Sequence, residues 1–163
     1  MDDQTLLELA ALTLQGRADH GQAYLAEQLR IPVAQVYSGD AALTTHQREK
    51  LRYLFTDYEW MLAQKMTLSE DTGRPAWRFQ AAKATIATAW LQAPEVETEL
   101  KKTTFASGQT EAHLQIRLDY GSHGLADILD FVVPNPELKQ LQTKQLTLLE
   151  FAQKQLPAPQ TED

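Results

Sequence analysis

The segment QAYLAEQLRIPVAQVYSG, residues 22–39, constrains the fold of this chain more than any other stretch. Apolar side chains recur at helical spacing up to Pro32, which then interrupts the pattern. Proline disfavours helical geometry at the residue before it, yet it fits the first turn of a new helix. Val33 and Val36 are three residues apart and therefore share one side of that new helix. We predict a helix, a tight turn and a second, short helix.

Two short helices joined in this way are typical of DNA-binding modules, which present the exposed side of the second helix to the major groove. The segment resembles the helix-turn-helix of the phage-repressor (Cro-like) family, whose apolar and small positions are matched here by Leu25, Ala26, Leu29, Ile31 and Val36. Two positions depart from the family pattern. Arg30 stands at the turn where the family usually has glycine, and Gly39 replaces an apolar residue, so the second helix should be about a turn short.

The resemblance also implies which residues would contact DNA. Gln22 matches the residue that opens the family's second helix and touches a phosphate, and the residues presented to bases would be Val33, Ala34, Tyr37 and Ser38. Arg48 and Lys50 would add contacts to the phosphate backbone. The side chains presented to bases are short and mostly apolar, which suits contacts with thymine methyl groups better than hydrogen bonds to guanine edges. The alternative interpretation is an ordinary pair of packed helices, with Arg48 and Lys50 as solvated surface charges.

The flanking sequence predicts an all-helical N-terminal domain over residues 1–66. Broad apolar stripes indicate one helix over residues 3–15 and another over residues 45–66. Thr44 precedes the second of these and is followed three residues later by Gln47, which is the pattern of a capping box. The polar segment 67–74 marks the boundary of this domain and begins the C-terminal part, residues 67–163.

The C-terminal part is predicted to be mostly helical with a small β element, so that the whole chain is mostly α with an α+β second half. We expect helices over residues 75–91, 95–102 and 135–156, the last of them capped by Asn135. Residues 113–120 alternate between apolar and polar side chains and predict a strand. Its partner would be residues 103–107 or, through a hairpin, residues 128–133.

Composition restricts the class of protein further. The 163 residues include no cysteine, which excludes disulfides and thiolate metal sites. The acidic start MDDQ and the lack of a long apolar run predict a soluble cytoplasmic protein without a membrane partner. The net charge of −7, of which residues 1–66 carry −3, is unusual for a nucleic-acid-binding protein. Binding would therefore need local basic clustering.

Side chains that could perform catalysis form one weak constellation. A hairpin would bring His113 near His123, with Asp127 or Asp130 beside them, although ordinary surface residues explain the same pattern. The four histidines lack the spacing of a zinc site, and no glycine-rich phosphate loop is present. We therefore predict no enzyme, no catalytic or metal-binding residues and no cofactor.

Taken together, the sequence predicts a cytoplasmic transcriptional regulator, of a bacterial or prophage kind, that binds double-stranded DNA. It would act as a homodimer, because one short recognition helix gives little affinity and paired half-sites multiply it. The C-terminal part would then oligomerise the chain or bind an effector. The alternative is an acidic, helical protein–protein interaction module that does not bind DNA, and the net charge favours this second interpretation.

Overall fold

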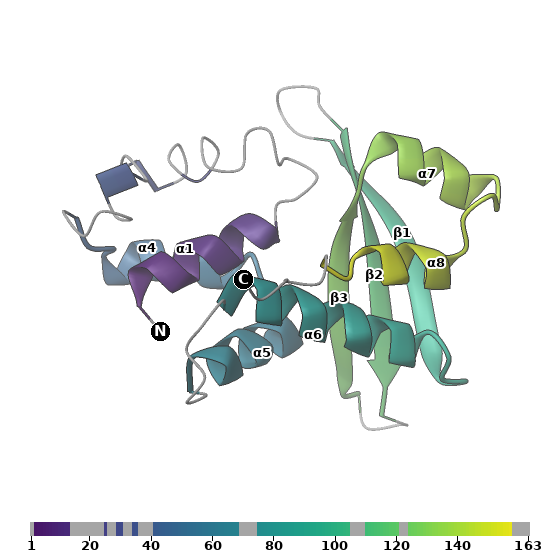
Figure 1. Ribbon diagram of the computed structural model, residues 1–163, viewed down its shortest axis with the longest axis horizontal. Coiled ribbons are helices and arrows are strands. Elements are labelled where there is room, and N and C mark those ends of the chain that lie inside the picture. The colour runs from purple at the N-terminus through teal and green to yellow at the C-terminus, as the bar shows by residue number, and fades with distance from the viewer. Residues whose placement is uncertain are drawn as a thin grey trace, which may run out of the picture.

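The computed structural model describes residues 2–13, 25, 29–30, 34–35, 41–68, 75–104, 110–120 and 124–157. Over these residues the chain forms six helices and one three-stranded antiparallel sheet, so the fold is mixed α+β (Figure 1). The sheet is larger than the small β element that the sequence predicted. Among the described helices, none combines the length and apolar character that crossing a bilayer requires.

The sheet is an antiparallel meander in the order β1-β2-β3. Its strands are β1 Val96–Thr104, β2 Thr110–Asp119 and β3 Ala126–Val133. The predicted strand over residues 113–120 and its hairpin with residues 128–133 are confirmed. The predicted helix over residues 95–102 is wrong, because residues 96–102 of this charged segment belong to β1 and pair with β2. Backbone pairing with a neighbouring strand here overrides a local helical preference.

Three helices cover one face of the sheet, α6 Pro75–Trp90, α7 Asn135–Gln142 and α8 Leu148–Lys154 (Figure 1). Even-numbered side chains of β2 point into this layer, where Leu114 and Ile116 are fully buried. They pack with Leu129 of β3 and Phe151 of α8 in one apolar cluster. The alternation of residues along β2 therefore sets which face of the sheet becomes core.

A second apolar cluster lies beside the sheet, among α1 Asp3–Leu12, α4 Thr45–Arg52 and α5 Asp57–Leu68. Its centre is formed by three leucines of α1 that are fully buried, Leu6, Leu7 and Leu9. Phe79 of α6 belongs to this cluster, whereas Ala87 and Trp90 of the same helix belong to the sheet core. One helix thus joins the two cores, and residues on both sides of the predicted boundary at residues 67–74 pack together.

The single helix predicted over residues 45–66 is wrong, because the chain is broken between α4 and α5. Thr56 and Glu59 form a capping box: Thr56 N–H donates to Glu59 Oε1 and Glu59 N–H donates to Thr56 Oγ1, both at 3.1 Å. A capping box starts a new helix and cannot lie inside a continuous one. The predicted box at Thr44 and Gln47 is confirmed at the start of α4.

The single helix predicted over residues 135–156 is also wrong. Lys144 has a left-handed backbone, with φ of +62°, and this ends α7. Thr147 and Glu150 then form a third capping box, which starts α8. The predicted cap at Asn135 is not formed either, because Pro134 is the residue that precedes the helix and no side chain caps it.

Candidate functional site

The described residues of the predicted helix-turn-helix have the backbone and burial that a packed helix needs. Leu25 and Leu29 are helical and buried, and both belong to the cluster around the leucines of α1. Gln47 Nε2 donates to the carbonyl oxygen of Leu29 at 2.8 Å, which ties Leu29 to α4. Side-chain capping of this carbonyl places the start of α4 beside the following turn.

Arg30 occupies that turn and has a left-handed backbone conformation. Its φ is +57°, a region that residues other than glycine, asparagine and aspartate rarely adopt. This is the position at which the sequence departs from the usual glycine. An exposed arginine therefore has the backbone conformation that glycine adopts most easily, at a steric cost of about 1 kcal/mol.

Beyond the turn, Ala34 and Gln35 are helical and exposed. Ala41 N–H donates to the carbonyl oxygen of Gln35 at 3.1 Å and so links these two residues. The other predicted contact residues before α4, which are Gln22, Val33, Tyr37 and Ser38, lie outside the described residues.

The two basic residues predicted to contact phosphates lie on α4. Arg48 Nη1 forms an ion pair with Asp3 Oδ1 of α1, and Asp3 Oδ2 also accepts from Leu43 N–H at 2.9 Å. Asp3 thus orients Arg48 and fixes the connection that enters α4. Lys50 is exposed on the same helix. One of the two predicted phosphate contacts is therefore already engaged by an acidic side chain.

A second concentration of polar groups closes the outer edge of β3. Thr56 Oγ1 donates to Ile128 O at 2.6 Å, and Asp130 N–H donates to Glu59 Oε2 at 2.8 Å. Lys83 Nζ donates to Asp130 O at 2.6 Å and lies 3.1 Å from Glu59 Oε2. Side chains of α5 and α6 therefore take the place of a fourth strand.

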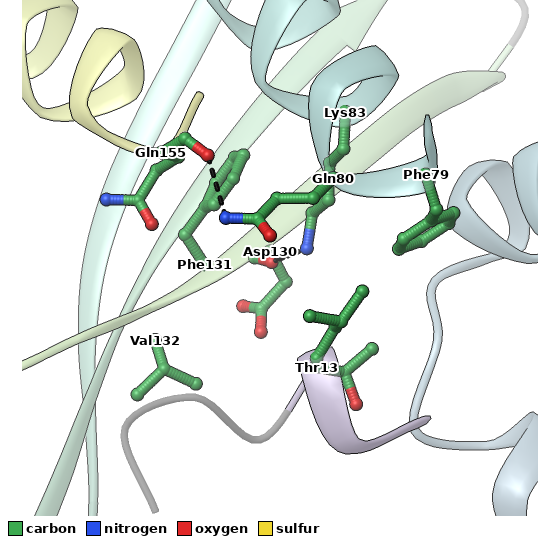
Figure 2. Close-up of a pocket in the computed structure, with 9 residues that line it drawn as sticks. Thr13, Phe79, Gln80, Lys83, Asp130, Phe131, Val132 and Gln155 are labelled. Atoms are coloured by element: carbon green, nitrogen blue, oxygen red, sulfur yellow. Dashed lines mark hydrogen bonds between the residues drawn. The ribbon is translucent and has the colours of Figure 1, made fainter. Parts of the chain in front are cut away.

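Next to this edge lies a small cavity, shown in Figure 2, where Thr13, the residue after α1, faces α6 and β3. Gln80 Nε2 donates across it to the carbonyl oxygen of Gln155 at 3.0 Å. Its volume is about 30 Å³. A water molecule fits such a space, but small-molecule sites usually measure several hundred Å³.

His113 lies on the face of the sheet opposite to α6, α7 and α8, and it meets two acids. Its Nδ1 is 2.7 Å from Asp130 Oδ2 and its Nε2 is 3.3 Å from Glu111 Oε2. The hydrogen bond with Asp130, and after it the one with Glu111, raises the pKa of His113 to about 9. His113 and Asp130 line an open groove of about 290 Å³, together with Lys101 and Tyr53.

This arrangement brings together only part of the constellation that the sequence suggested. Asp130 reaches His113, but Asp127 binds the hydroxyl of Tyr120 instead, and His123 lies outside the described residues. A general base works best with a pKa near the working pH, and His113 holds its proton too tightly for that at neutral pH. Among the described residues, no group of three or more histidine, aspartate or glutamate side chains is arranged so that it could hold a metal ion.

Sequence reasoning missed the buried charges at the β3 edge, although two signals were present. The run Thr56-Asp57-Tyr58-Glu59 has the spacing of a capping box, and Lys83 is a single charge within an alanine-rich apolar helix. A lone lysine on a buried stripe needs an acidic partner, which points to a nearby carboxylate.

Comparison of the chain with protein-family models, with curated proteins and with solved structures gave no match. The functional inference therefore depends on the side chains themselves and on their geometry.

Proposed function

We propose that the chain is a sequence-specific DNA-binding transcriptional regulator that acts as a dimer, with residues 22–39 as its helix-turn-helix. The observation that carries this proposal is the backbone of Arg30, which has a φ of +57° between helical Leu29 and helical Ala34. A left-handed residue at this point of the motif is what the family's glycine provides. Arg30 thus has the backbone conformation that glycine adopts most easily, although no glycine stands at this position.

Burial on the two sides of the turn supports the same proposal. Leu25 and Leu29 before the turn are buried against α1, while Ala34 and Gln35 after it are exposed. In a DNA-binding pair, the first helix packs on the domain and the second presents its outer side to the major groove. Val33, Ala34, Tyr37 and Ser38 would meet bases, and Gln22, Arg48 and Lys50 would meet phosphates.

The proposal is tested by a salt titration of binding to a mixed pool of double-stranded DNA. Affinity gained through phosphates falls steeply with salt, so we expect micromolar binding at about 50 mM salt to weaken by about tenfold or more at about 200 mM. Replacing Lys50 with alanine should lower the salt slope by about one if that residue touches a phosphate. Absence of binding at the lower salt concentration would refute the proposal.

A substitution that adds a charge at residue 34 tests where the recognition surface lies. We expect Ala34→Glu to weaken DNA binding by about tenfold, because it places a carboxylate in the negative potential of the DNA groove, while the uncharged Ala34→Gln, of the same size as the glutamate, should bind far better. Gln153→Glu makes the same change in net charge at an exposed site on α8. An equal loss in Ala34→Glu and Gln153→Glu would show that the effect is general electrostatics rather than a local contact.

A protein–protein interaction module is the second candidate, and the pairing of Arg48 with Asp3 favours it. In that case the exposed helical surface around Ala34 would meet a protein, and Arg48 would serve only to join α1 and α4. The two functions differ in the titration, because only the DNA-binding protein loses its affinity for DNA as salt rises.

A further inference from the structure

The two edges of the sheet differ in whether their outward backbone groups have hydrogen-bond partners among the described residues. The outer edge of β3 is closed by Thr56, Glu59 and Lys83, whereas β1 pairs with β2 on one side, and no described strand pairs with its other side. Six successive residues of β1, 97–102, are exposed. The strand also pairs with β2 over nine residues without a bulge, and it contains no proline. It therefore has the straight, open backbone that pairs with another strand.

The hydrogen bonds at β3 show which groups of β1 face outward. In an antiparallel strand, the N–H and C=O of one residue point to the same neighbour. Asp130 directs both groups away from β2, so its partner Gln115 directs both toward β1, where it pairs with Glu99. The even-numbered residues of β1, with Leu100 in the middle, therefore direct N–H and C=O outward.

We propose that β1 pairs antiparallel with β1 of a second copy of this chain, about a two-fold axis at Leu100. The two three-stranded sheets would then form one continuous sheet. A two-fold pairing must match each strand with itself, and Leu100 is the central residue of Val96–Thr104, so this register uses the whole strand. It also matches even-numbered residues with even-numbered ones, as the outward hydrogen-bonding groups require.

Side chains in this register are complementary on both faces. On the face of His113, Glu99 of each copy lies opposite Lys101 of the other, and the two side chains already approach to 3.6 Å within one copy. On the helix-covered face, Leu100 meets Leu100. Leu100 is 39% exposed in the single chain although its neighbour Leu114 is fully buried, so pairing would extend the apolar layer across the axis.

Neighbouring registers with the same hydrogen-bonding pattern place like charges opposite each other. An axis at Glu99 sets Glu99 against itself, an axis at Lys101 sets Lys101 against itself, and an axis at Thr98 sets Glu97 against Glu99. Like charges directly across a strand pair are destabilising. The charges of β1 therefore select the register centred on Leu100.

The proposal is tested by exchanging the charges at residues 99 and 101 and measuring the molar mass of each variant. Size-exclusion chromatography with light scattering at about 100 μM protein gives this mass. We expect wild-type dimers, and we expect Glu99→Lys and Lys101→Glu each to raise the dimer dissociation constant by about tenfold or more. The double variant should return to wild-type affinity. An equimolar mixture of the two single variants should form heterodimers, because the two substituted side chains then face each other with opposite charges, and so do the native Lys101 of one copy and the native Glu99 of the other.

Glu97→Lys is the matched control, because it makes the same charge change on the same strand but lies opposite the uncharged Thr103. Far-ultraviolet circular dichroism checks that each exposed substitution leaves the fold intact. A wild-type monomer at this concentration, or a dimer that the exchange at 99 and 101 does not weaken, would overturn the proposal. This dimer rests on the proposed function only because paired DNA half-sites require a second copy of the chain. The experiment contains no DNA, so a failure to dimerise is distinct from a failure to bind DNA.

Discussion

The buried pair of Glu59 and Lys83 shows how single side chains decide stability in this protein. Glu59 is 1% exposed and Lys83 is 7% exposed, yet together they satisfy the N–H and C=O of Asp130. Taking charges out of water is costly, and it is tolerated when each charge is both paired and hydrogen-bonded. Each member of this pair therefore depends on the other.

We predict that Lys83→Met lowers the free energy of unfolding by about 3–5 kcal/mol, because it leaves the Glu59 carboxylate buried without its cation. Lys139→Met, at an exposed site on α7, is the control and should change stability by less than about 0.5 kcal/mol. Urea unfolding measures both. Similar small losses in the two variants would mean that Glu59 is not buried as a charge.

The raised pKa of His113 predicts that the stability of the protein depends on pH. An unfolded histidine has a pKa near 6.5, whereas the hydrogen bonds with Asp130 and Glu111 raise the pKa of His113 to about 9. The folded protein binds the proton more tightly, so the stabilisation is complete below about pH 6.5 and is lost as pH rises through about 9. We expect a loss of about 1–3 kcal/mol over this interval, measured by urea unfolding at a series of pH values. The His113→Gln variant should lack it, and an equal slope in the variant would contradict the assignment.

At the scale of elements, the break between α4 and α5 connects the helical core to the sheet. Thr56 caps α5 through Glu59 and also donates to Ile128 O of β3. Thr147 and Glu150 make a similar capping box at α8, where the hydroxyl of Thr147 donates to Glu150. The two threonines share one local role, and Thr56 adds a contact to a distant strand.

We therefore predict that Thr56→Ala costs about 2–3 kcal/mol, the sum of a lost cap and a lost buried hydrogen bond. Thr147→Ala should cost about 1 kcal/mol, because only the cap is lost. Chemical denaturation of the two variants under the same conditions gives the comparison. Equal losses would show that the bond to Ile128 contributes nothing.

At the scale of the whole molecule, α6 joins the two apolar clusters. Phe79 packs edge-on against Phe55 at a centroid distance of 6.0 Å, and further along the same helix Trp90 packs against Tyr58 at 5.0 Å. Each of these aromatic pairs links α6 to the segment that precedes residue 67. Because both clusters use this helix, unfolding of one should expose the other.

We predict one cooperative unfolding transition, reported alike by Trp60 in the helical core and by Trp90 beside the sheet. Single-tryptophan variants followed by fluorescence in urea would measure it. Phe79→Ala should shift both reports together, with a loss of about 3–5 kcal/mol. Two separate midpoints, or a shift of Trp60 alone, would instead indicate two independent domains.

The sequence by itself determined the elements whose patterns are local. The leucine stripe of α1, the alternation along β2 and the capping box at Thr44 each lie within a few residues, so side-chain spacing predicts them. The capping box at residues 56–59 is an equally local pattern. However, apolar residues recur at helical spacing across residues 51–62, and this spacing predicted one continuous helix. The break between α4 and α5 was missed for that reason.

Only the tertiary structure decided the rest. Residues 95–102 carry a charge pattern that suits a helix, but residues 96–102 lie in β1 because β2 offers them backbone partners. The pairing of Lys83 with Glu59, of His113 with Asp130 and of Arg48 with Asp3 depends on distances between segments far apart in the chain. Periodicity reports which face of an element is apolar, but it contains no information on which other element that face will meet.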